Sequence, residues 1–110
     1  MPSVPLSLLT RWQRTQLTGA PLEKQFEATA EFVETWQNGH SATANEKLDT
    51  YKYFKQASTG DVDCPQPGFL QLTERMKWNA WKSVEGMTRE NAMQLYVAEI
   101  VAQRAKYDSL

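Results

Sequence analysis

Glycine and proline divide this chain into segments, and the positions of these breakers limit the folds that it can adopt. Between them, apolar residues recur at steps of three and four, which is the period of an amphipathic helix. Asn38-Gly39, the stretch 61–68 with its two prolines, and Gly86 each interrupt the pattern, because glycine favours helix ends and proline cannot continue a helix. No segment alternates polar and apolar residues for long, so no strand is predicted. The expected fold class is all-α, with four helices around one core.

Local signals place the ends of these helices. Pro21 suits the first turn of a helix. Thr43 and Glu46 have the spacing of a capping box, in which each side chain binds the other residue's backbone N–H. Gly39 is expected to end the first helix in the left-handed conformation, and Thr88 is suited to the N-cap of the last helix. The four helices are therefore expected over residues 21–37, 43–59, 69–84 and 88–107.

The first 20 residues differ in composition from the rest of the chain. They contain no acidic residue, since the first is Glu23, and they carry Trp12 and two arginines among leucines and hydroxyl residues. This composition resembles an amphipathic surface-binding peptide or one that targets a protein to mitochondria or another organelle. The apolar residues also approach helical spacing, which favours a short extra helix or arm packed on the bundle. Both interpretations stay open, and the expected domains are an N-terminal arm over 1–20 and a helical domain over 21–110.

Composition and charge exclude several classes of function. The chain of 110 residues has a net charge of −1, so no overall basic field points to nucleic acid. Cys64 is the single cysteine and can form no internal disulfide, which suits a reducing compartment, and we expect a cytoplasmic protein. Together with His40 and the pair Asp61 and Asp63, it makes no recognisable metal-ligand set. Because no nucleophile–base pair is evident, we expect neither an enzyme nor a cofactor. A monomer is the expected state, since the expected fold needs no partner.

Lysines lie among aromatic residues on two of the predicted helices. Tyr51 and Lys55 are one turn apart, with Phe54 beside them, and Lys77 falls on the same helix face as Trp81. Burying an ammonium group costs several kcal/mol unless an anion meets it. These faces therefore indicate a pocket for a ligand that is both anionic and flat, a binding site rather than an active site.

The order and spacing of these residues resemble those of the acyl-CoA-binding protein family. The resemblance is carried by YKYFKQASTGD at 51–61, Pro67-Gly68, KWNAW at 77–81, Gly86, Asn91-Ala92-Met93 and Tyr96. It implies an up-down four-helix bundle of that family's type, with the N-terminal arm or short helix as an addition. It also implies reversible binding of fatty acyl-CoA esters for transport or buffering, with acyl-CoA-using enzymes or membranes as transient partners.

The resemblance further implies which residues contact the ligand. In the family, the counterparts of Tyr51, Lys55 and Lys77 hold the nucleotide and its 3′-phosphate, and the counterpart of Tyr96 completes that pocket. The expected ligand-binding residues are Tyr51, Lys52, Tyr53, Phe54, Lys55, Lys77 and Tyr96. Leu48 and Met76 are expected to line a groove for the acyl chain, whereas Trp81 is expected in the core.

Three residues depart from the family pattern. Phe54 stands where a tyrosine is usual, so that ring stacking is kept while a hydroxyl is lost. Glu34 falls where members often carry a lysine near the head group, and Lys47 falls where an apolar side chain usually lines the acyl groove. These departures leave a second hypothesis open: a degenerate helical interaction module that docks a protein or a membrane surface.

Overall fold

The computed structural model describes residues 9–108, which contain five α-helices and one 3₁₀ helix. They are α1 (Arg11–Leu17), α2 (Leu22–Thr35), η2 (Gln37–Ser41), α3 (Ala44–Ser58), α4 (Leu72–Lys82) and α5 (Arg89–Tyr107). No strand occurs within these residues, and the predicted all-α class is confirmed. None of the described helices combines the length and the apolar composition that crossing a membrane requires.

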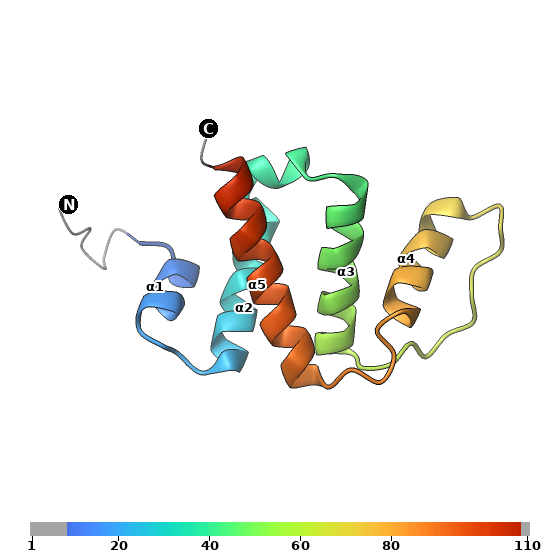
Figure 1. Cartoon of the computed structure of the whole chain (residues 1–110), viewed down its shortest axis with the longest axis horizontal. Helices are drawn as coiled ribbons and strands as arrows, with labels where there is room; N and C mark the ends of the chain where they lie inside the picture. The colour runs from blue at the N-terminus through green and yellow to red at the C-terminus, as the bar shows by residue number, and fades with distance from the viewer. Residues whose placement is uncertain (1–8, 109–110) are drawn as a thin grey trace.

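The helices lie side by side in an order that differs from their order in the chain. α5 packs against both α2 and α3, while α1 packs on α2 and α4 packs on α3. Figure 1 shows α1 and α4 at opposite ends of this row, with α2, α5 and α3 between them. The molecule is accordingly elongated, with extents of 53, 30 and 17 Å along its principal axes. α4 is thus an end helix that meets the bundle through α3.

The hydrophobic core joins α1, α2, α3 and α5. Its buried residues are Trp12, Phe26, Ala28, Ala57, Ala92, Tyr96 and Ile100. Trp12 is only 1% exposed, and its ring stacks on Phe32 of α2 with 4.5 Å between centroids. Arg11 adds an ion pair to Glu31 at 2.7 Å. The extra helix, one of the two alternatives for the N-terminal segment, therefore packs on the bundle; residues 1–8 of the predicted arm lie outside the described residues.

Two predicted helix starts are confirmed by their caps. The Glu46 N–H donates to Thr43 Oγ1 at 3.1 Å, and the Thr43 N–H donates to Glu46 Oε1 at 2.8 Å, which is the reciprocal pattern of a capping box. At the start of α5, Thr88 Oγ1 accepts a hydrogen bond from the Asn91 N–H at 3.1 Å. Each helix begins one residue after its capping threonine.

The predicted role of Gly39 is wrong. α2 ends at Thr35, and Gly39 lies within η2. The glycines with positive φ among the described residues are Gly19, Gly60 and Gly86. A Cβ at position 39 would lie 3.0 Å from Cε3 of Trp36, so glycine there permits the close approach of the indole ring. Gly39 is therefore suited to this position because it lacks a side chain, and not because it can adopt the left-handed conformation.

α4 is shorter than the predicted span of 69–84. It begins at Leu72 because the preceding residues form a turn, in which the Gln71 N–H donates to the Gly68 carbonyl at 2.9 Å. The Arg75 guanidinium also donates to the Pro67 carbonyl at 3.0 Å, tying the proline-containing loop to the helix. The loop therefore continues three residues further than the sequence pattern predicts.

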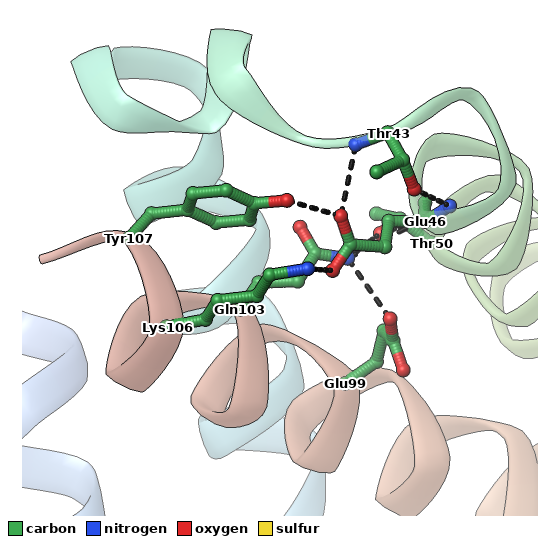
Figure 2. A network of polar contacts seen from close by, with 7 residues as sticks. All are labelled: Thr43, Glu46, Thr50, Glu99, Gln103, Lys106 and Tyr107. Atoms are coloured by element: carbon green, nitrogen blue, oxygen red, sulfur yellow. Dashed lines mark hydrogen bonds and ion pairs between the residues drawn. The ribbon is translucent and has the colours of Figure 1, made fainter.

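Glu46 fastens the first turn of α3 to the end of α5 (Figure 2). Its carboxylate accepts hydrogen bonds from the Tyr107 hydroxyl and the Thr43 N–H, and the Lys106 ammonium lies 3.4 Å away. These contacts, the Tyr107 hydrogen bond foremost, lower the pKa of Glu46 from 4.5 to about 2. An ionised carboxylate is thus part of the junction between the two helices.

Gln103 extends this network along α5 (Figure 2). The residue is buried, and its amide donates to Thr50 Oγ1 at 2.9 Å and to Glu99 Oε1 at 3.0 Å. Satisfying a buried amide in this way avoids the cost of leaving it unpaired. The junction fixes the turn of α3 that bears Lys47 and Leu48, and so positions one wall of the site described next.

Candidate functional site

A groove between α3 and α4, called here the Tyr51 groove, has a volume of about 300 Å³. It is lined by Ala44, Lys47, Leu48, Tyr51, Thr73, Met76 and Lys77. Leu48 and Tyr51 are three residues apart on α3 and share a face, as do Thr73 and Met76 on α4. The structure therefore brings Leu48, Tyr51, Met76 and Lys77 together in one cavity.

Lys77 and Tyr51 face each other across this groove. The Lys77 ammonium lies 5.6 Å from the centroid of the Tyr51 ring, and its ion pair with Glu74 is long, at 3.9 Å. Burial raises the pKa of the Tyr51 hydroxyl, and the negative charge of Glu74 adds to that rise. The groove wall therefore offers a protonated hydroxyl and an ammonium group, both of which can donate hydrogen bonds.

Lys55 lies one turn beyond Tyr51 on α3. Its ammonium is 4.7 Å from the centroid of the Trp81 ring, a distance typical of a cation–π contact. Trp81 is buried, as predicted, and its indole N–H donates to the Gly60 carbonyl at 2.8 Å, which fixes the ring. Among residues 9–108, Lys55 forms no ion pair with a carboxylate. The Trp81 ring therefore positions the Lys55 ammonium, which can still form an ion pair with an anionic ligand.

Phe54 and Tyr96 belong to an aromatic cluster with Phe26. The Phe54 ring centroid lies 5.8 Å from that of Tyr96 and 5.9 Å from that of Phe26. Phe54 is 37% exposed, whereas Tyr96 is 2% exposed. Burial, and secondarily the negative charge of Glu34, raise the pKa of Tyr96 to about 12. Tyr96 is thus a core residue that packs against Phe54, and Phe54 is the member of these two that reaches the surface.

Lys52 and Tyr53 point away from Tyr51. Successive residues of a helix are about 100° apart around its axis, so three consecutive side chains cannot share a face. Lys52 pairs with Asp49 at 2.9 Å and lines a second groove between α3 and α4, called here the Lys52 groove, of about 540 Å³. Tyr53 is half-buried and packs against the core. The structure does not bring these two residues together with Tyr51 and Lys77.

Ala44, Lys47 and Thr73 also line the Tyr51 groove. The family pattern had placed Lys47 at the acyl groove, whereas Ala44 and Thr73 are absent from the predicted residues. Helix geometry could have found Thr73, since it is one turn before Met76 or Lys77. Within residues 9–108, no group of three or more His, Cys, Asp or Glu side chains is placed to hold a metal ion.

Comparison with known proteins yields one family. A model described as "Acyl CoA binding protein" matches residues 23–100. The chain is 40% identical to the "Acyl-CoA-binding protein homolog 3" of Caenorhabditis elegans over 78 residues, which cover 69% of this chain and 67% of that protein. It is 41% identical to the "Acyl-CoA-binding domain-containing protein 1" of Oryza sativa subsp. japonica over 80 residues, 72% of this chain and 85% of that protein.

A solved structure resembles the fold as well. The crystal structure of Acyl-CoA-Binding Protein 2 from Oryza sativa superposes with a TM-score of 0.75 at 34% identity, covering 81% of this chain and 97% of the other. The family match includes the segments that form the Tyr51 groove, since residues 23–100 contain α3 and α4 entirely.

Proposed function

Since the chain belongs to the acyl-CoA-binding protein family, we propose that it binds fatty acyl-CoA esters reversibly and carries or buffers them without covalent chemistry. The observation that carries the proposal is the Tyr51 groove, in which cationic donors and apolar side chains line one cavity. Coenzyme A thioesters combine phosphates, a flat base and an apolar tail, and each of these parts needs a different kind of contact.

The phosphates would meet Lys55 and Lys77. A hydrogen bond to a charged group contributes about 1.5–3 kcal/mol net, and neither ammonium is held by a close carboxylate. The Tyr51 hydroxyl, one turn before Lys55 on α3, supplies a neutral donor. The exposed face of Phe54 would stack on the adenine, and base–aromatic stacking contributes about 1–3 kcal/mol in nucleic-acid proteins.

The acyl chain would lie over Leu48 and Met76. Met76 is 42% exposed, so apolar surface is available on the groove floor. Each buried methylene contributes about 0.8 kcal/mol, and a chain that buries several of them outweighs either lysine alone. In this proposal the chain length sets the affinity and the head group sets the identity of the ligand.

The remaining predicted residues have less direct roles in the proposal. Tyr53 and Tyr96 pack with the core and would support Phe54, while Lys52 would border the site from the adjoining groove. The protein would act as a cytoplasmic monomer, with enzymes that use acyl-CoA or membranes as transient partners.

A second candidate function is a docking module for a protein or membrane surface. Phe69 and Leu70 favour it, because they precede α4 and are 77% and 88% exposed. Large apolar side chains that lie together on the surface often mark interaction sites. This function would not require Lys55 or Lys77.

Calorimetric titration with coenzyme A esters of eight to eighteen carbons separates the two functions, with free coenzyme A and free fatty acid as controls. We expect the esters to bind much more tightly than either control, and their affinity to fall with added salt because lysine–phosphate pairs are screened. If no ester binds even at low salt, the carrier function is wrong and docking through the exposed apolar residues becomes the better hypothesis.

A further inference from the structure

Lys47 places a cation at the end of the Tyr51 groove away from Lys55. Lys47, Tyr51 and Lys55 follow one another at steps of four on α3 and so form one stripe along the helix. At 1.5 Å per residue, the Cα atoms of the two lysines are separated by about 12 Å along the axis. Lys47 lines the groove together with Leu48 and Met76, whose side chains form its apolar part. Lys47 and Lys77 both line the groove, so its apolar residues lie beside two cations, and Lys55 follows one turn beyond Tyr51 on α3.

The carboxylates near Lys47 are engaged elsewhere. The Glu46 carboxylate accepts a hydrogen bond from the Tyr107 hydroxyl and pairs with Lys106, both of which lie on α5. The Asp49 carboxylate pairs with Lys52 at 2.9 Å. Among residues 9–108, the Lys47 side chain itself forms neither a hydrogen bond nor an ion pair. Nothing described in the protein therefore neutralises this ammonium, although it borders a surface suited to an acyl chain.

We infer that Lys47 recognises a negative charge at the far end of the acyl chain, so that ω-carboxy acyl-CoA esters are ligands of this site. The inference rests on the proposed function, because it assumes that a coenzyme A ester lies in the Tyr51 groove with its phosphates toward Lys55 and Lys77. An ω-carboxy ester is a dicarboxylic acid joined to coenzyme A through one of its two carboxyl groups. Its free carboxylate would form a charge-assisted hydrogen bond with the Lys47 ammonium.

The methyl end of an ordinary fatty acyl group offers no such contact. A terminal methyl group beside Lys47 gains nothing from the charge, and the lysine must then turn its ammonium to water while its stem covers the groove. A carboxylate that leaves water for a groove wall without a cation would conversely lose hydration without a compensating contact. Lys47 therefore reverses the usual preference of an apolar groove for an uncharged chain end.

The test compares two ligands in two proteins. Plain and ω-carboxy esters of matched length, from six to fourteen carbons, are titrated by calorimetry into the wild type and Lys47→Met, which keeps a long side chain without the charge. For each length, the ratio of the two dissociation constants gives the selectivity for the carboxylate. Lys24→Met serves as the control, because Lys24 lies on α2 and lines neither groove. Thermal unfolding of each variant verifies that it is folded.

We expect Lys47→Met to reduce the selectivity for the ω-carboxy ester by about tenfold at the length that reaches position 47, and Lys24→Met to leave it unchanged. Methyl esterification of the free carboxylate should remove the difference between wild type and variant. The inference is overturned if plain esters bind but selectivity is the same in wild type and Lys47→Met. It is also overturned if Lys47→Met weakens both ester types and free coenzyme A alike, since Lys47 would then contact the phosphates. Failure of every ester to bind would instead overturn the proposed function.

Discussion

The ammonium of Lys77 on α4 lies 5.6 Å from the centroid of the Tyr51 ring on α3, and this contact spans the groove between the two helices. An exposed cation–π contact contributes about 0.5–1 kcal/mol. The long ion pair of Lys77 with Glu74, at 3.9 Å between exposed side chains, adds little more. A phosphate that bonds to the ammonium at about 1.5–3 kcal/mol would replace both contacts with a net gain. Lys77 is therefore held in place by interactions that a phosphate ligand can displace.

Removal of the Lys55 ammonium, one turn beyond Tyr51 on α3, should weaken ligand binding. We expect Lys55→Ala to reduce the affinity for an acyl-CoA ester at least about tenfold, because a charge-assisted hydrogen bond to a phosphate is lost. Calorimetry at low salt measures the change. Lys82→Ala is a matched control, since Lys82 pairs with Glu85 at 2.7 Å and lines neither groove. Equal affinities for Lys55→Ala and the wild type would contradict the assignment of the phosphates to Lys55.

Trp81 should matter for folding. The side chain is 4% exposed, and its N–H bonds to the Gly60 carbonyl, so truncation leaves a cavity and an unpaired carbonyl group. We expect Trp81→Ala to lower the free energy of unfolding by about 3–5 kcal/mol, measured by urea denaturation. Phe69→Ala, at a residue that is 77% exposed, should change it by less than about 0.5 kcal/mol. Normal stability of Trp81→Ala would show that the interface of α4 with α3 does not depend on this ring.

Trp12 tests whether α1 is part of the folded core. Its removal eliminates the stack on Phe32 and uncovers part of α2, so we expect Trp12→Ala to lower the free energy of unfolding by about 3 kcal/mol. Ligand affinity should be unaffected in the folded variant, because the Tyr51 groove lies between α3 and α4, and α1 lies at the opposite end of the row of helices from α4 (Figure 1). An unfolding curve identical to that of the wild type would mean that α1 is not needed by the bundle.

The Glu46 network predicts how stability depends on acid. The pKa of Glu46 is lowered from 4.5 to about 2, chiefly by the Tyr107 hydroxyl. Between these values the unfolded chain binds a proton that the folded chain does not, so acid favours unfolding. The stabilisation by this carboxylate is therefore complete above an ordinary carboxyl pKa and is lost as the pH falls toward 2.

Tyr107→Phe isolates this contribution, because it removes the largest cause of the lowered pKa of Glu46 without changing the size of the ring. We expect its melting temperature to be below that of the wild type near neutral pH, and the gap to close as the pH falls to about 2. Melting curves of both proteins across this range provide the measurement. A gap that stays constant in acid would assign the effect of Tyr107 to packing instead of the charge of Glu46.

Short-range signals predicted the helices and their caps, while side-chain packing and loop hydrogen bonds decided what those signals missed. Thr43 and Thr88 cap helices by binding N–H groups three residues away, which the sequence spacing reveals. Gly39 was expected in the left-handed region, but it lies within η2, where its missing Cβ allows the close approach of the Trp36 ring. The sequence pattern did not predict η2. The late start of α4 likewise follows from bonds between Arg75, Gln71 and the loop before them.

The candidate site was predictable in part. The steps of three and four that join Leu48, Tyr51 and Lys55 follow from helix geometry, and the same geometry turns Lys52 and Tyr53 away from Tyr51. Lys52 instead lies one turn after Leu48, and both line the Lys52 groove. Exposure could not be predicted from the sequence in this way: Phe54 and Tyr96 contact each other, yet one is open to solvent and the other is buried by α2 and α3. Which predicted residues touch a ligand therefore depends on packing between helices that are far apart in the chain.

The most direct test of the central claim is to map the backbone amide signals of the protein by NMR while dodecanoyl-CoA is added. We expect the largest shifts at Lys47, Leu48, Tyr51 and Lys55 on α3 and at Met76 and Lys77 on α4, with little change in α1. Saturable shifts confined to these helices would place the ester in the Tyr51 groove. No saturable shift, or shifts centred on α1 or on the loop before α4, would contradict the account.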